Sequence, residues 1–234
     1  MAFSFKQFSI HDDRCAMKVG IDAVLLGAWA DVTETQNILD IGTGSGVIAI
    51  MLAQRSEAEI HAVEIEQATA KQARENAILS PWSDRVKVVN LSIQEFSSNC
   101  ELKFDLIVCN PPYFNNSLLS PSSGRNLARH TNELSYEELA EAFAKLIKPD
   151  GKCCVILPIP ESKLLESIMA DKGLIPYRKL LVSPKPEKTA NRVLIQFEKA
   201  VIKQAKMESI SIRKIDHTYS GEYKQLTEDF YLNF

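Results

Sequence analysis

The chain has 234 residues, of which 45% are hydrophobic and 24% charged, and this length makes one large folded domain the expected arrangement. Nine Gly and ten Pro residues exclude a collagen-like or low-complexity chain. The 27 basic and 30 acidic side chains give a net charge of −3, which excludes a globally basic nucleic-acid binder but not a local basic patch.

No apolar run approaches the ~18 residues that a membrane-spanning helix needs. The opening residues MAFSFKQFSIHDDR lack the apolar stretch of a secretory signal, so we expect a cytoplasmic protein with no membrane partner. The five Cys residues form no C-x-x-C pair, and the four His residues lack the i, i+4 spacing of a metal-binding helix. We therefore expect reduced thiols and no metal.

From residue 37 onward, short β-branched runs alternate with amphipathic segments of helix length, a pattern typical of a parallel sheet in an α/β fold. The third and fourth expected strands are joined by a loop. The expected strands are Asn37–Ile41, Glu59–Glu64, Val86–Leu91, Phe104–Cys109 and Lys152–Leu157. The expected helices lie near Val47–Arg55, Gln67–Ser80, Tyr136–Ile147 and Glu161–Lys172.

The alternation changes after these helices. Tyr177–Val182 and Arg192–Lys199 are strand-like, and the connection SPKPEKTAN is too short for a crossover helix, so they should pair antiparallel. The fold class is thus α/β, with a mixed, mostly parallel sheet that ends in a C-terminal antiparallel hairpin. We expect a single, monomeric domain over residues 1–234, with an N-terminal cover segment (1–31), an α/β core (32–199) and a C-terminal extension (200–234) that docks on the sheet edge.

The segment LDIGTGSGVIAI is an apolar strand that breaks at three glycines and resumes as a helix. Gly42 and Gly44 can adopt turn conformations that a Cβ would hinder, and Gly46 permits close helix packing or ligand approach. Val47 stands where the dinucleotide fingerprint G-x-G-x-x-G requires its third glycine, which disfavours a nicotinamide cofactor. A tight strand-to-helix connection without a ligand is the alternative interpretation.

Glu64 ends the second expected strand, 22 residues after Gly42, where a carboxylate can accept hydrogen bonds from both hydroxyls of an adenosine ribose. The alternative is a solvated charge at a strand end. Together, the glycine turn and the carboxylate favour a cofactor that contains a nucleoside. Asp40 lies between the apolar Leu39 and Ile41, so we expect it to orient the glycine turn or to meet the amino group of the cofactor.

The strand-like run FDLIVC leads into Asn110, Pro111, Pro112 and Tyr113, at the sheet edge where open α/β folds bind ligands. The two prolines stiffen this turn and remove two N–H donors. The Asn110 side-chain oxygen and the Pro111 carbonyl can accept the N–H groups of an exocyclic amine and stabilise charge that develops on its nitrogen. Tyr113 can stack on the planar group. These four residues are the candidate catalytic residues, and a merely rigid turn is the alternative.

GTGSG, Glu64 and NPPY, in this order and spacing, resemble the class I S-adenosylmethionine-dependent amino-methyltransferases. The resemblance implies a Rossmann-like fold and S-adenosylmethionine as the cofactor. It also implies that Glu64 binds the cofactor ribose, that NPPY binds the target amine with Asn110 also beside the cofactor, and that Ile93 and Gln94 lie near the cofactor adenine. The Asp common at the start of that last segment is absent here.

More of the chain resembles the bacterial tRNA(Val) adenine-N6 methyltransferases, which modify the adenosine at position 37 of the anticodon loop. The resemblance implies that Lys18, Gly20 and Asp22 close over the cofactor, and a helix over Met17–Trp29 that covers the sheet is compatible with it. The matching stretches are HDDRCAMKVGIDAVLLGAWA, SPW at Ser80–Trp82, NPPYF, ARHT at Ala128–Thr131 and DFYL at Asp229–Leu232.

A tRNA substrate requires phosphate contacts that offset the cost of unstacking its target base. Five cations across the expected hairpin, Arg178, Lys179, Lys185, Lys188 and Arg192, against Glu187 give a local charge of 5 − 1 = +4. The alternative for these cations is that they are solvated surface charges. Phe114 either forms a second wall of the base pocket or anchors the loop in the core. The candidate substrate-binding residues are Phe114, Arg125, Arg129, His130, Lys185, Lys188 and Arg192.

Three alternatives stay open. NPPY also occurs in methyltransferases that act on guanine N2 in ribosomal RNA and on a glutamine of release factors. A module that keeps this fold and only binds RNA is a second alternative, which the intact NPPY and Glu64 disfavour. A nicotinamide oxidoreductase is the third.

Overall fold

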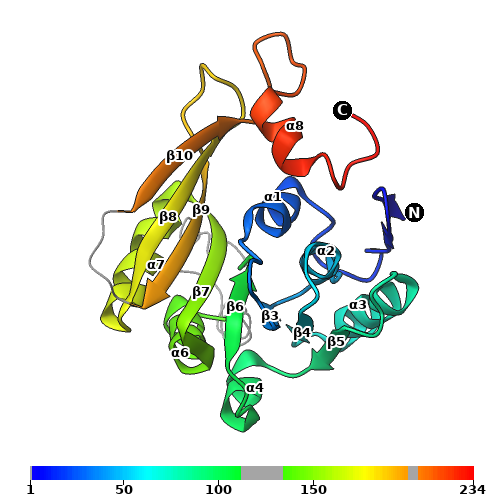
Figure 1. Cartoon of the computed structure of the whole chain (residues 1–234), viewed down its shortest axis with the longest axis vertical. Helices are drawn as coiled ribbons and strands as arrows, with labels where there is room; N and C mark the ends of the chain where they lie inside the picture. Colours follow the sequence, from blue (N-terminus) through cyan, green and yellow to red (C-terminus); the bar gives the residue numbers. More distant parts are fainter. Residues whose placement is uncertain (1, 112–133, 200–204) are drawn as a thin grey trace, which may run out of the picture.

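The computed structural model describes residues 2–111, 134–199 and 205–234. Its centre is an eight-stranded sheet with the strand order β10-β8-β9-β7-β6-β3-β4-β5 (Figure 1). A separate two-stranded ribbon joins β1 (Phe3–Ser4) to β2 (Ser9–Ile10). The strands of the large sheet are β3 (Asn37–Ile41), β4 (Glu59–Glu64), β5 (Val86–Asn90), β6 (Phe104–Cys109), β7 (Ile147–Pro158), β8 (Leu174–Ser183), β9 (Arg192–Lys199) and β10 (Lys206–Ser211).

Helices cover both faces of the sheet. One hydrophobic core lies under α1, α2 and α3, and the other lies under α4, α6 and α7. The small α8 packs near α1. The helices are α1 (Ile21–Trp29), α2 (Val47–Arg55), α3 (Gln67–Leu79), α4 (Ile93–Asn99), α6 (Tyr136–Leu146), α7 (Ile159–Asp171) and α8 (Gly221–Thr227). Within the described residues, no helix is long and apolar enough to cross a membrane.

The direction of the strands places several loops at one edge of the sheet. β9 is antiparallel to β7 and to β8, whereas the other neighbouring strands of the described sheet run parallel. Cys109 pairs with Val155 of β7, and Arg192 pairs with Pro158 of the same strand. The loop from β8 to β9 therefore lies at the edge where β3, β4 and β6 end.

The mixed, mostly parallel sheet with an antiparallel hairpin is confirmed. The prediction that only a loop joins β5 to β6 is wrong, because α4 occupies part of this connection. Ser92 caps this helix by accepting from Glu95 N at 3.1 Å, while Glu95 Oε2 accepts from Ser92 N at 3.1 Å. A seven-residue helix spans two turns, so its apolar period is too short to distinguish it from a loop.

Several other boundaries differ from the expected ones, since α1 begins at Ile21 rather than Met17 and β8 begins at Leu174 rather than Tyr177. β7 begins at Ile147 rather than Lys152, because Ile147 already pairs with Phe104 across an irregularity in the ladder. The C-terminal extension adds β10 to the sheet edge, parallel to β8, in addition to its apolar contacts. The two ends of the chain lie close together in Figure 1, where Lys6 N donates to Phe230 O at 2.8 Å.

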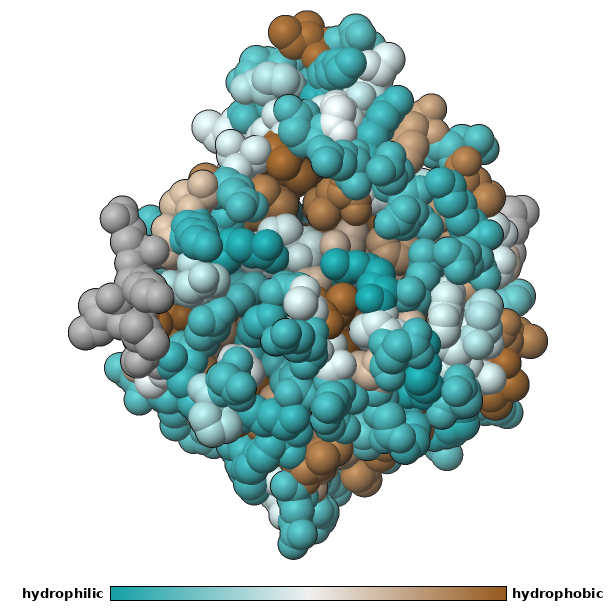
Figure 2. Space-filling view, in the orientation of Figure 1, coloured by the Kyte–Doolittle hydropathy of each residue, from teal (hydrophilic) through white to brown (hydrophobic). Residues whose placement is uncertain are grey.

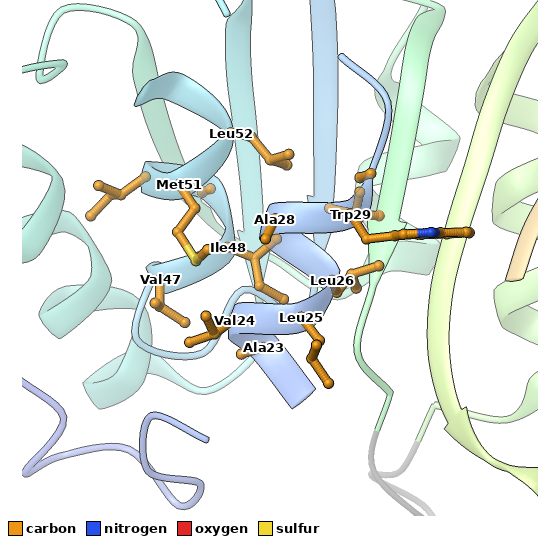
Figure 3. Packing of buried hydrophobic residues seen from close by; sticks show 14 of the residues in the cluster. Ala23, Val24, Leu25, Leu26, Ala28, Trp29, Val47, Ile48, Met51 and Leu52 are labelled. Atoms are coloured by element: carbon orange, nitrogen blue, oxygen red, sulfur yellow. The ribbon is translucent and has the colours of Figure 1, made fainter. Parts of the chain in front are cut away.

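The pair α1 and α2 anchors the N-terminal segment to the sheet. Figure 3 shows Val24 and Ala28 of α1 facing Ile48 and Met51 of α2. Gly27 allows this approach, since a Cβ there would lie 2.9 Å from Met51 Sδ. On the face in Figure 2, hydrophilic residues dominate and the hydrophobic ones form small separate groups.

Candidate functional site

The glycine turn connects β3 to α2. All three of its glycines have a positive φ, which favours residues without a Cβ. A Cβ at Gly42 or Gly44 would meet nothing within 4 Å, whereas one at Gly46 would lie 3.5 Å from Ala73 of α3. Gly42 and Gly44 therefore face open space, and Gly46 packs against α3 at the start of α2.

Asp40 bonds to the glycine turn through Thr43. Its side chain is fully buried, and its Oδ2 accepts a hydrogen bond from Thr43 Oγ1 at 2.6 Å. Burial raises the pKa of Asp40 to about 7, the charge of Glu64 adds to this shift, and the Thr43 bond opposes it. Of the two expected roles, orientation of the turn is the one that these contacts support.

Glu64 lies at the end of β4 and is held by backbone donors. Its Oε2 accepts from Gly44 N at 3.0 Å, and its Oε1 accepts from Glu66 N at 3.0 Å. Only 9% of the residue is exposed. Each carboxylate oxygen keeps a lone pair for a further donor, so the group can bind a diol while its position stays fixed.

A cavity of about 600 Å³ opens over these strand ends, within the size range of small-molecule sites. Both open glycines and Glu64 line it, together with residues after β5 and β6. Its lining comprises Ala16, Met17, Ile41, Gly42, Gly44, Val63, Glu64, Ile65, Glu66, Thr69, Leu91, Ser92, Ile93, Gln94, Cys109, Asn110, Pro111, Leu134 and Glu138.

Asn110 and Pro111 enter the cavity directly after β6. Asn110 Oδ1 is buried and has no hydrogen-bond partner among the described residues, which is costly unless a ligand supplies a donor. Pro111 is buried beside it. The other candidates of this region lie outside the described residues: Pro112, Tyr113, Phe114, Arg125, Arg129 and His130.

The N-terminal segment reaches the cavity through other residues than those expected. Ala16 and Met17 line it, whereas Lys18 donates from Nζ to Asp12 O at 2.6 Å and Gly20 caps α1. Two buried amides of α3 hold the same segment. Gln72 Oε1 accepts from Arg14 N at 2.8 Å, and Asn76 Oδ1 accepts from His11 N at 3.0 Å. No sequence motif of this segment indicated those contacts.

The five hairpin cations, Arg178, Lys179, Lys185, Lys188 and Arg192, differ in their surroundings. The Arg178 guanidinium lies 4.1 Å from the Trp29 ring centre and donates to Trp29 O. Lys179 pairs with Glu166 at 2.6 Å, and Arg192 pairs with Asp22 at 2.9 Å. These three bind within the chain, and Asp22 thereby joins α1 to β9.

Lys185 and Lys188 belong to the loop between β8 and β9. Lys188 is exposed, and Lys185 Nζ lies 3.0 Å from His217 Nε2. Arg213 and Lys214 follow β10 at the same edge, and the Arg213 guanidinium lies 4.3 Å from the Tyr219 ring centre. Sequence analysis missed these C-terminal cations, because only the tertiary structure brings them beside the hairpin.

Glu138 is another residue of the cavity that sequence analysis missed. It lies in the first turn of α6, where its backbone N donates to Ser135 Oγ at 3.1 Å. Its carboxylate accepts a hydrogen bond from Ser135 N at 2.9 Å, which lowers its pKa, and the nearby Gln94 side chain lowers this pKa further. The S-x-x-E signature of a helix start at Ser135 was the available signal.

Comparison with known proteins defines the class. Residues 16–137 match the model of the methyltransferase small domain family. The fold is shared with a predicted O-methyltransferase from Agrobacterium tumefaciens, with a TM-score of 0.68 and 20% identity over 89% of this chain and 96% of that one. A ribosomal protein L11 methylase from Lactobacillus delbrueckii has a TM-score of 0.52 and 18% identity over 76% of this chain and 77% of its own.

Curated relatives narrow the class to a family. A protein from Bacteroides fragilis is 48% identical over 98% of this chain and 97% of its own length, and one from Trichodesmium erythraeum is 46% identical over 99% and 98%. Both are named tRNA1(Val) (adenine(37)-N6)-methyltransferase. The chain belongs to the family of these methyltransferases.

Proposed function

We propose that this protein transfers a methyl group from S-adenosylmethionine to the exocyclic N6 amine of adenosine 37 in the anticodon loop of tRNA(Val). Relatives that match nearly the whole chain bear that activity in their names. The structural observation that carries the proposal is the buried Asn110 Oδ1, unpartnered among the described residues, in a cavity that Glu64 also lines. A tRNA substrate places the reaction in the cytoplasm, and the acceptor chemistry requires no metal.

The described residues fit S-adenosylmethionine. Glu64 offers carboxylate lone pairs to the two ribose hydroxyls. Gly42 and Gly44 carry no Cβ, so the space beside them is left for the ligand. When bound, S-adenosylmethionine supplies an electrophilic methyl group on a sulfonium sulfur, which retains the bonding electrons after transfer. Asp40 keeps the glycine turn in place through Thr43.

Asn110 and Pro111 act on the target amine. The nitrogen lone pair of adenine N6 is delocalised into the ring, so the amine needs help to become a nucleophile. Asn110 Oδ1 and the Pro111 carbonyl each accept one N–H, which favours a pyramidal nitrogen and stabilises the positive charge that grows on it. Because these acceptors are positioned before the substrate arrives, no strong base is required before transfer, and the methylated nitrogen, now positively charged, then releases one proton to solvent.

The RNA itself binds beyond the cavity. Lys185 and Lys188 lie on the loop at the same sheet edge as Asn110, and Arg213 and Lys214 extend this surface. Phosphate contacts to such cations offset the cost of moving the adenine out of its stack, which is smallest in an unpaired loop. Arg192 pairs with Asp22 and thereby fixes the start of β9, beside this loop, against α1.

Mass spectrometry of nucleosides tests the proposal. Purified protein and S-adenosylmethionine are incubated with unmodified tRNA(Val), and N6-methyladenosine is expected at position 37. Parallel reactions with a radioactive methyl donor contain total tRNA, ribosomal RNA or release factor. Label in ribosomal RNA or release factor alone would contradict the tRNA assignment and support one of the other NPPY substrates.

A further inference from the structure

Three of the six buried residues of α3 are polar, and all three bond to the N-terminal loop, residues 11–19. They are Thr69, Gln72 and Asn76, whose spacing of three and four residues places them on one side of the helix. A buried polar group is costly unless it is hydrogen-bonded. This side of α3 therefore binds the loop through specific hydrogen bonds.

Asn76 joins the N-terminal loop to the glycine turn. Its side chain is fully buried, and its Oδ1 accepts from His11 N at 3.0 Å. Its Nδ2 donates to His11 O at 2.7 Å and to Ser45 O at 2.8 Å. Ser45 lies between Gly44 and Gly46 of the turn. Both amide hydrogens are used, so this one side chain fixes the spacing between the loop and the turn.

Gln72 holds the next part of the same loop. Its Oε1 accepts from Arg14 N at 2.8 Å, and its Nε2 donates to Asp13 Oδ1 at 2.7 Å. The loop is closed on itself by Asp12, whose Oδ2 accepts from Val19 N at 2.9 Å. The N-terminal loop is thus a closed unit that the two buried amides anchor on α3.

The anchored loop brings two residues to the cavity. Ala16 and Met17 line it, and both are exposed, so burial of their own side chains does not fix their position. Their position depends instead on the anchors of the loop. If the proposed function holds, Glu64 binds the ribose of the cofactor, and the N-terminal loop and the glycine turn are two walls of the space that the cofactor fills.

We propose that Asn76 and Gln72 are positioning residues for the cofactor, which hold the N-terminal loop so that Ala16 and Met17 restrain the bound molecule and slow its dissociation. Neither amide lines the cavity, so both act through the loop. When an anchor is removed, Glu64 can still accept the ligand, but the loop no longer restrains it. The effect therefore falls mainly on the dissociation rate.

Surface plasmon resonance with S-adenosylhomocysteine and the full-length protein tests this inference without RNA. Asn76→Ala and Gln72→Ala should each raise the dissociation rate about tenfold, as expected for the loss of one or two hydrogen bonds, with little change in the association rate. Gln72→Ala leaves the contact between Asn76 and the glycine turn in place, so it reports on the loop alone. Should Asn76→Ala fail to fold, Gln72→Ala still decides the question.

Gln196→Ala is the matched control. Gln196 is also a buried amide, but it lies in β9, does not line the cavity, and donates to Glu198 Oε1 at 2.6 Å. Hydrogen exchange should be faster over residues 11–19 in Asn76→Ala and in Gln72→Ala than in wild type. Gln196→Ala should change neither this exchange nor the dissociation rate.

The outcomes distinguish this inference from the proposed function. A wild-type protein that does not bind S-adenosylhomocysteine would overturn both. Binding by wild type with an unchanged dissociation rate in Gln72→Ala would overturn the inference alone, even if exchange over residues 11–19 became faster. An increase in Asn76→Ala only would assign the effect to the glycine turn, and an equal increase in Gln196→Ala would assign it to general stability. Either result would also overturn the inference.

Discussion

The proposed cofactor side and the proposed RNA side of this site are built by different means. On the cofactor side, backbone N–H groups of Gly44 and Glu66 hold Glu64. On the proposed RNA side, side chains of other elements bind several of the cations, as Glu166 does for Lys179 and Asp22 does for Arg192. A backbone N–H is present whatever the residue, whereas a side-chain partner depends on residue identity, so a cation of the hairpin is assigned a role only once its partners are known.

The largest expected effect is on the chemical step. Asn110→Ala removes a preorganised acceptor at the target amine, so the single-turnover rate of methyl transfer should fall by about 10²–10³-fold. The affinity for S-adenosylhomocysteine should be retained, because Glu64 and the glycine turn still hold it. Quench-flow and calorimetry measure the two quantities. Abolished cofactor binding would refute the role assigned to Asn110.

Cofactor affinity should depend on the carboxylate of Glu64. Glu64→Gln places an NH2 group against backbone N–H donors and loses acceptors for the ribose, so the dissociation constant of S-adenosylhomocysteine should rise by about 10- to 100-fold. Glu59→Gln, at the exposed start of the same strand, is the matched control. An unchanged constant for Glu64→Gln would remove the ribose contact from the proposal.

Asp40 predicts a pH dependence of stability. Burial raises its pKa from an ordinary value of 3.8 to about 7, so the folded protein binds its proton more tightly than the unfolded chain does. The stability this gives is complete below the unfolded pKa and is lost as pH rises through about 7. Urea unfolding at a series of pH values should show wild type losing stability relative to Asp40→Asn over this interval. Parallel pH profiles for the two proteins would contradict the assignment.

The smallest effects are expected for the cations proposed to face the RNA. They should differ between Lys185 and Lys188 of the loop and Arg178, which binds within the chain. Replacing Lys185 and Lys188 by Ala should weaken tRNA binding a few-fold and lower the salt slope by about 1 for each phosphate that the side chains no longer reach. Arg178→Leu should instead reduce thermal stability, by about 1 kcal/mol, and leave the slope unchanged, because Arg178 stacks on Trp29.

Filter binding at several salt concentrations and thermal unfolding measure these two quantities. Equal salt slopes for the wild-type protein and the double Lys variant would show that the loop between β8 and β9 does not contact RNA. A lower slope for Arg178→Leu would mean that its guanidinium reaches the RNA despite its position over Trp29.

Much of the fold could be predicted because strong patterns are local. The boundaries of β3, β4, β6 and β9 agree with the expected ones, since each is an apolar run bounded by turn residues or charges. The short α4 and the edge strand β10 were missed. Seven residues carry too little periodicity, and an edge strand with four exposed residues shows no apolar run.

Some of the predicted site residues line the cavity and others do not. Gly42, Gly44, Glu64, Asn110 and Pro111 line one cavity, as do Ile93 and Gln94. Lys18 and Gly20 do not line it, because Lys18 bonds to Asp12 O and the neighbouring Ala16 and Met17 take that position. Which side of an irregular segment faces a ligand depends on its anchors, here Gln72 and Asn76 of α3.

The sequence by itself determined the strand ends that carry the glycine turn, Glu64 and the NPPY turn, because parallel strands bring consecutive carboxyl ends to one edge. It also determined, through its resemblance to a family, the reaction that we propose. Only the tertiary structure decided that Glu138 and Gln94 line the same cavity, that Asp22 pairs with Arg192 and that the C-terminal cations adjoin the hairpin. Those contacts join residues far apart in the chain, and no local pattern encodes a distance through space.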